Sequence, residues 1–186
     1  MDARLTDRDR RTELERATLR EILMGAQDNL TNVLAVVLGV AIGAGRSDLV
    51  ALAGLAAGVA EAISMGGVLY TSTRADLDLD ARVRAEAGGV VAPVGRRRLG
   101  PAQAGIVCFA AAMVAGLVPL IPFAFLPLQG AVVACFIVSI LALFGLGSWA
   151  GGVTGRSPWR DGLRLVLIAG TAALAAALIG VILRID

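Results

Sequence analysis

Two acidic residues lie in or beside apolar stretches of this sequence, where an ionisable side chain is costly. Asp28 comes directly before one apolar run, and Glu61 lies in the middle of the next. A charged side chain at the centre of a bilayer costs ~2.5 to 3.5 kcal/mol on insertion scales, so an acid in such a segment is a candidate functional residue. Asn32 follows Asp28 by four residues and Met65 follows Glu61 by four, which places each pair on one face of a helix.

These four side chains offer two carboxylates, an amide and a thioether, which together can replace the hydration shell of a divalent transition metal ion. Oxygen ligands suit Mg²⁺ or Mn²⁺, whereas a thioether shifts the preference toward softer ions such as Fe²⁺. The sequence contains no histidine, so no imidazole ligand is available. Each residue also has a structural interpretation: Asp28 as a helix N-cap or interfacial carboxylate, Glu61 as a protonated packing residue, and Met65 as core filler.

The composition is that of a protein that crosses a membrane several times. The chain has 186 residues, of which 57% are hydrophobic and 17% are charged. Besides the segment that begins near Asp28, four apolar segments approach or exceed the roughly 20 residues that a helix needs to cross the hydrocarbon. These segments are 49–70, 101–118, 128–149 and 163–183. The sequence therefore predicts an all-α membrane protein with five transmembrane helices.

Arginine placement predicts the orientation of these five helices. All seventeen basic residues are Arg, and most of them lie in the tail that ends at Arg20, in 74–98 and in 156–164. Five spans put these three regions on one side, and the positive-inside rule makes that side cytoplasmic, with Asp186 outside. Orientation accounts for the arginines, so we expect no nucleic-acid binding. The absence of Lys indicates a GC-rich bacterial genome, and hence a multi-pass protein of the bacterial cytoplasmic membrane.

The first 24 residues are strongly charged and predict a separate element. Thr12 and Glu15 fit a helix capping box. Two interpretations stay open: an amphipathic cytoplasmic helix on the membrane surface, and an ordinary solvated helix. We expect this N-terminal helix over 1–24 and the five-span domain over 25–186, with a short cytoplasmic loop at 71–100.

Small residues recur at four-residue spacing, which lets helix backbones approach closely in compact bundles and in dimers. The pairs are Gly39 and Gly43, Gly54 and Gly58, and Gly147 and Gly151. The two cysteines, Cys108 and Cys135, lie inside apolar runs, where a thiol behaves as a small hydrophobe. We therefore expect no disulfide and no thiolate metal site.

Four stretches of the chain together resemble, in their order, the signature segments of the vacuolar iron transporter family. They are REILMGAQDNLTNVLAVVLGVA, AISMGGVLYTS, LVPLIPFAF and LALFGLGSWAGGVTGRSPWRDGLRLVLIAG. The resemblance implies a homodimer in the lipid bilayer that moves Fe²⁺, and often Mn²⁺, out of the cytosol in exchange for protons, along a path between the subunits. The metal is then the transported substrate, and no cofactor is expected. The family's first-span aspartate falls on Asp28, and its Ser-Met pair falls on Ser64 and Met65.

The sequence departs from the family pattern at two places. Many members carry a glutamate eight residues before the methionine, where this chain has Ala57, and Glu61 comes one helical turn later. In members with a cytoplasmic metal-binding domain, a long Glu-rich helical module follows the second span, and here only 71–100 remains. The acidic residues of this stretch are Asp76, Asp78, Asp80 and Glu86. Their alternation is more typical of a solvated strand or turn than of a metal site.

The leading functional hypothesis is a proton-coupled metal exporter. Burial favours a protonated carboxyl group and a bound cation favours the ionised form, so metal arrival would release a proton. Because the second span runs opposite to the first, we expect Asp28 and Met65 to share one site, with Glu61 slightly deeper. The first spans of two subunits would meet at Gly39 and Gly43.

The alternative function is a non-transporting membrane interaction or structural protein, whose buried acids only hold helices together. An enzyme is not expected, because the sequence has no histidine, no zinc motif and no nucleophile elbow.

Overall fold

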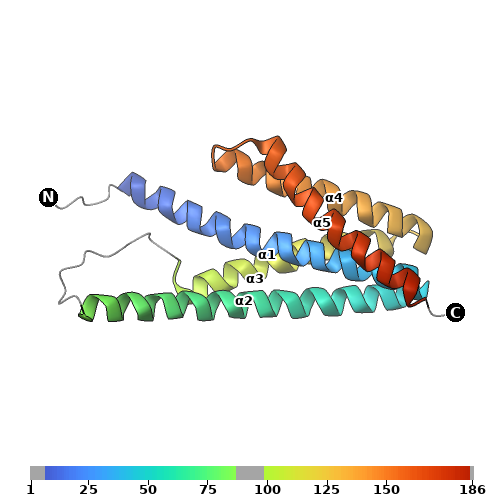
Figure 1. Ribbon diagram of the computed structural model, residues 1–186, viewed down its shortest axis with the longest axis horizontal. Helices are drawn as coiled ribbons and strands as arrows, with labels where there is room; N and C mark the ends of the chain where they lie inside the picture. Colours follow the sequence, from blue (N-terminus) through green and yellow to red (C-terminus); the bar gives the residue numbers. More distant parts are fainter. Residues whose placement is uncertain (1–6, 87–98, 185–186) are drawn as a thin grey trace.

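The computed structural model describes residues 7–86 and 99–184, and over this part the chain is almost entirely helical (Figure 1). The elements are α1 (Asp7–Ala44), α2 (Ser47–Glu86), α3 (Pro101–Leu117), the 3₁₀ helix η1 (Val118–Ala124), α4 (Leu128–Val153) and α5 (Pro158–Ile182). Five helical segments, with α3 and η1 counted as one, are long and apolar enough to cross a membrane. The predicted all-α, five-span fold class is confirmed.

Glycine and proline residues set the connections between the helices. Gly45 (φ 63°) ends the first helix and Gly155 (φ 69°) lies between α4 and α5, in backbone conformations that residues with a side chain rarely adopt. Pro101 and Pro158 stand at the first positions of α3 and α5, where a missing N–H leaves no helical hydrogen bond unmade. These residues fix where successive helices reverse direction.

Helix α1 is the centre of the bundle. It packs against α2 and α3 on one side and against α4 and α5 on the other, while α2 packs mainly on α3 and α4 mainly on α5 (Figure 1). Its residues Val33, Leu34 and Val37 are fully buried and form the middle of the largest apolar cluster. A side chain on α1 can therefore touch either helix pair.

The two ends of the bundle differ in which chain segments they hold. Figure 1 shows the beginning of α1, the end of α2, the beginning of α3 and the α4–α5 connection at one end, and the α1–α2 turn and the end of α5 at the other. The described arginines of the three predicted patches thus lie toward one end. Large apolar side chains such as Leu52, Leu141 and Leu174 point outward, as lipid contact requires. The protein is a multi-pass membrane protein.

The charged N-terminal segment and the first span form one helix. The sequence predicted an N-terminal helix over 1–24 with a capping box at Thr12 and Glu15. In the structure α1 runs from Asp7 to Ala44, so Thr12 lies inside the helix and not at its start. Residues 12–24 are rich in Leu, Glu and Arg, which are strong helix formers, and contain no glycine or proline. Nothing in the local sequence therefore ends the helix before the membrane span.

Helix α2 is also longer than the sequence predicted. Residues 71–86 were expected to form a loop, with Asp76, Asp78 and Asp80 on a strand or turn, but they continue the helix. No glycine or proline interrupts them, and a helix exposed to water needs no apolar run. The rest of the predicted loop, 87–98, lies outside the described residues.

The glycine pair of the first span packs inside the chain. A Cβ atom added to Gly39 would lie 3.2 Å from the carbonyl oxygen of Ala176, and one added to Gly43 would lie 3.3 Å from that of Gly180. The two glycines thus let α1 approach α5 of the same subunit. Such spacing predicts a close helix neighbour without saying which helix it is. Dimerisation through the first spans stays a prediction.

Candidate metal-binding site

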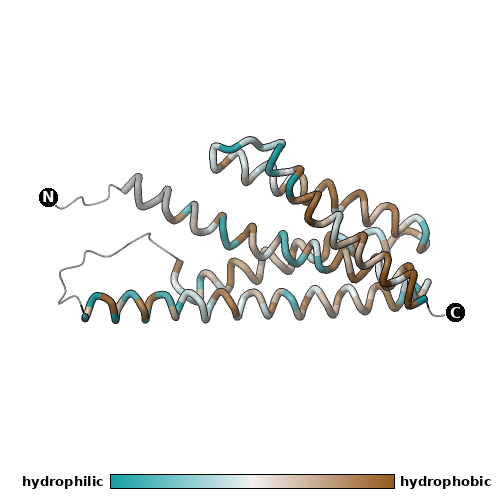
Figure 2. The backbone as a smooth tube through the Cα atoms, viewed as in Figure 1, coloured by the Kyte–Doolittle hydropathy of each residue, from teal (hydrophilic) through white to brown (hydrophobic). Residues whose placement is uncertain are grey.

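The polar residues of the first span interrupt an otherwise apolar helix. Figure 2 shows a hydrophilic stretch part-way along α1, at the level where α2 runs beside it. The two helices are antiparallel, and Asn32 of α1 contacts Glu61 of α2: Asn32 Nδ2 donates a hydrogen bond to Glu61 Oε2 at 3.1 Å.

Asp28 completes this polar cluster. It lies one turn before Asn32 on the same face of α1, and its carboxyl group is close enough to that of Glu61 for the two to interact. Three of the four residues predicted from sequence are therefore brought together. We refer to Asp28, Asn32 and Glu61 as the α1–α2 cluster.

The α1–α2 cluster lies on an uncovered face of the single subunit. Asp28 is exposed, and Asn32 and Glu61 are half-buried. A carboxylate in a membrane span does not face lipid, so this face must meet water or another protein surface. Among the described residues, no group of three or more Asp, Glu or Cys side chains is arranged to hold a metal ion. The uncovered face of one subunit thus offers two carboxylates and one amide.

Met65 lies beside the α1–α2 cluster, in an apolar environment. Together with Met24 it packs against the small buried cluster of Leu69, Ala104 and Cys108, where α2 meets α3. The sequence predicted one site for Asp28 and Met65, whereas the structure pairs Asp28 with Glu61 and places Met65 with Met24. A metal-binding role of the Met65 thioether stays a prediction.

Asn29 is a polar residue to which the sequence gave no role. It is fully buried, and its Nδ2 donates hydrogen bonds to the carbonyl oxygens of Gly58 in α2, at 2.9 Å, and Ala112 in α3, at 2.8 Å. It thus links three helices, one residue away from Asp28. The only sequence signal was an amide beside an acid at the start of an apolar run, which does not reveal which helices it joins.

A second acid on α1 also escaped the sequence analysis. Glu21 precedes Asp28 by seven residues, or two turns, and is only 7% exposed. Its Oε2 has no hydrogen-bond partner among the described residues. The spacing of seven could have identified it, because residues two turns apart share a helix face. The buried surface of α1 thus carries an acid on the N-terminal side of the cluster.

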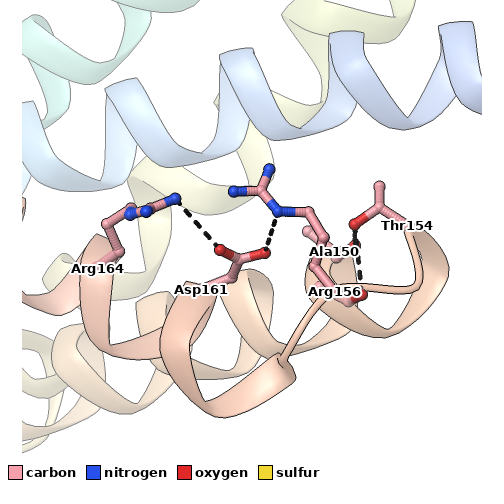
Figure 3. Close-up of polar contacts among 6 residues, drawn as sticks. Ala150, Thr154, Arg156, Asp161 and Arg164 are labelled. Carbon is pink, nitrogen blue, oxygen red and sulfur yellow. Dashed lines mark hydrogen bonds and ion pairs between the residues drawn. The ribbon is translucent and has the colours of Figure 1, made fainter.

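Two of the arginines in 156–164 form ion pairs with an acid of the same segment (Figure 3). Asp161 pairs with Arg156 (Oδ2 to Nε, 3.3 Å) and with Arg164 (Oδ1 to a terminal guanidinium nitrogen, 3.5 Å). Nearby, Thr154 Oγ1 donates to the carbonyl oxygen of Ala150 at 2.8 Å, at the end of α4. Both oxygens of this carboxylate are paired with arginines, so the network shapes the α4–α5 connection and is no metal site.

Comparison with known proteins identifies the family. The sequence matches the VIT family over residues 19–88 and 76–181. This chain belongs to the VIT family. It is 31% identical to vacuolar iron transporter homolog 4 of Arabidopsis thaliana, over 84% of this chain and 79% of the relative, and 32% identical to homolog 1 of the same plant, over 84% and 78%. The match confirms the resemblance seen in the sequence.

Relatives of this VIT chain are named as transporters, not as enzymes. A vacuolar iron transporter of Centaurea cyanus is 28% identical over 86% of this chain and 85% of the relative. That alignment spans 211 positions, more than the VIT chain has residues, whereas the alignment with homolog 4 spans 163. The Centaurea protein therefore carries residues without a counterpart here.

Proposed function

We propose that this protein transports a divalent metal ion, Fe²⁺ and also Mn²⁺, out of the cytosol in exchange for protons. The α1–α2 cluster carries this proposal, because it places two interacting carboxyl groups and an amide within membrane spans. Membership in a family whose relatives are named vacuolar iron transporters supports it. The oxygen-rich ligands suit Mn²⁺ and Fe²⁺.

The two carboxyl groups account for coupling between metal and protons. Two carboxylates close together in a low-dielectric environment do not both stay ionised without a compensating positive charge. Either a proton or a metal cation supplies that charge, so the two occupants of the cluster exclude each other. Asn32 donates to Glu61 and holds one carboxylate oxygen in place while the occupant changes.

A second copy of the chain is the natural cover for the exposed face. One subunit supplies two carboxylates and an amide, fewer ligands than the six oxygens typical of an octahedral site. Two copies related by a two-fold axis would bring two α1–α2 clusters toward each other and remove Asp28 from lipid. We therefore propose a homodimer with the metal path at its interface.

We further propose that the end of the bundle that holds the α4–α5 connection is cytoplasmic, because most of the arginines lie there. The test is labelling of single cysteines at two exposed positions, Ser47→Cys and Ser157→Cys; the native thiols of Cys108 and Cys135 are fully buried. An impermeant reagent in the cytosol should modify Ser157→Cys, and the same reagent outside should modify Ser47→Cys. Modification of both from one side would contradict five spans.

The proposed exchange is tested in liposomes that contain the purified protein and a pH-sensitive dye. Addition of Fe²⁺ or Mn²⁺ on one side should move metal across the membrane and protons in the opposite direction. Glu61→Gln keeps the shape and an oxygen ligand but cannot exchange a proton. Metal-driven proton movement should therefore be largely lost, with part of the metal binding retained. Unchanged proton movement in this variant would exclude Glu61 from coupling.

The alternative is a non-transporting membrane protein in which the bond between Asn32 and Glu61 only joins α1 to α2. The wild-type measurement separates the two functions. Liposomes that bind metal but show no metal-dependent flux of metal or protons would support the alternative, since a purely structural cluster moves nothing.

A further inference from the structure

Asn29 makes two hydrogen bonds with one nitrogen atom, in a part of the bundle that no water reaches. Its Nδ2 donates both hydrogens, one to the carbonyl oxygen of Gly58 and one to that of Ala112. Asn29 is one residue from Asp28, and Gly58 is three residues from Glu61 on α2. We propose that Asn29 is a positioning residue for metal binding: its amide fixes the rotation of α1 against α2 and α3, and thereby the separation of Asp28 and Glu61.

A small change in the rotation of α1 moves the tips of its side chains by a large distance. Side chains reach about 5 to 6 Å from the helix axis, so a 20° rotation of α1 would move the Asp28 carboxylate by roughly 2 Å. Metal ligands tolerate deviations of only a few tenths of an ångström. A hydrogen bond restricts rotation because it weakens steeply with angle, and two such bonds to different helices restrict it from two directions.

The geometry argues against Asn29 as a metal ligand itself. An amide binds a metal ion through its oxygen, and Asn29 Oδ1 is buried next to Gly116 of α3 with no hydrogen-bond partner among the described residues: a Cβ added to Gly116 would be 3.1 Å from Oδ1 and 2.7 Å from Nδ2. The amide therefore sits between helices and not among the carboxylates of the α1–α2 cluster. It acts on the metal through Asp28 and Glu61, so this inference rests on the proposed function.

Gly116 offers a second, independent way to disturb the same amide. Gly116→Ala leaves Asn29 in place but puts a methyl group where the amide lies. Alanine is a better helix former than glycine, so a harmful effect would not come from helix propensity. In an Asn29→Ala background the clash disappears, and the second substitution should have little further effect. The two changes are therefore expected to be strongly non-additive.

The experiment measures Mn²⁺ uptake into liposomes, with its KM and maximal rate, and Mn²⁺ binding to the detergent-purified protein. Asn29→Ala and Gly116→Ala should each raise KM and the dissociation constant about 10-fold, as loss of an outer-sphere partner does, with the maximal rate changed less than about 3-fold. The double variant should resemble Asn29→Ala. The inference would be overturned if the KM of the double variant rose by the product of the two single effects. It would also be overturned if both single variants kept the wild-type KM.

Ser139→Ala is the matched control. Ser139 is also fully buried and polar, but lies on α4, outside the contacts of Asn29. Its substitution should leave KM unchanged; an equal rise would mean that any buried polar loss has this effect, and would also overturn the inference. Should Asn29→Ala fail to fold, Asn29→Asp keeps the shape with at most one hydrogen to donate, and must raise KM as well.

The outcomes separate this inference from the proposed function. A wild-type protein that moves no metal refutes transport, and the binding measurement in detergent then still tests Asn29. A wild-type protein that transports, with Asn29 and Gly116 variants of normal KM, refutes the positioning role alone.

Discussion

Asp28→Ala is expected to abolish metal transport in a protein that still folds. The side chain is exposed in the subunit and interacts with Glu61, so its removal takes away a proposed ligand without leaving a cavity. We expect uptake of Fe²⁺ and Mn²⁺ to fall at least ~100-fold, beyond the loss typical of an outer-sphere partner.

Asp48→Ala is the control for this experiment. Asp48 is an exposed acid at the other end of α2, paired with Arg46, and should be dispensable for transport. Uptake in liposomes and the elution profile of the purified proteins give the two readouts. A well-folded Asp28→Ala protein with the wild-type rate would make Asp28 a structural cap and remove the basis of the proposed metal path.

Gly147→Leu is expected to cause a large loss of stability. A Cβ on Gly147 of α4 would lie 2.7 Å from the carbonyl oxygen of Asp161 and 2.8 Å from Cα of Gly162, both backbone atoms of α5. Backbone cannot turn aside as a side chain does, so the two helices must separate. Overpacking of this kind costs up to about 3 kcal/mol, which corresponds to a fall in Tm of roughly 10 °C for a chain of this size.

The control lies two residues away on the same helix. Gly145 faces outward, with nothing within 4 Å of an added Cβ, so Gly145→Leu adds the same side chain to the lipid-facing surface. Its Tm should stay within about 2 °C of the wild-type value, since substitutions outside packed sites have small effects. Thermal unfolding of both proteins in the same detergent measures the difference. Equal Tm values would contradict the close α4–α5 packing.

The sequence predicted the number of spans and most of the candidate site because both depend on local patterns. Apolar runs of about 20 residues define spanning helices regardless of their neighbours. The four-residue spacing of Asp28 and Asn32 put them on one face of α1, although the bond from Asn32 to Glu61 was not predicted. The family resemblance, which rests on the same segments, is confirmed by the family match.

Features that depend on which helices are neighbours were beyond a single sequence. The Gly39 and Gly43 pattern predicted a close approach, but its partner proved to be α5 of the same chain. Asn29 was visible as a polar residue, yet its two acceptors lie 29 and 83 residues away along the chain. The predicted end of the second helix was wrong because the apolar pattern ends near Tyr70, whereas the helix continues through a charged stretch without glycine or proline.

The two sides of α1 are held by different kinds of force. Toward α2 and α3, Asn29 makes directional hydrogen bonds, whose strength falls when either helix turns or slides. Toward α5, Gly39 and Gly43 meet the backbone at Ala176 and Gly180 by van der Waals contact, which has no angular preference and changes little during a small shift along the groove. Helix α1 can therefore slide along α5 more easily than it can slide along α2 and α3.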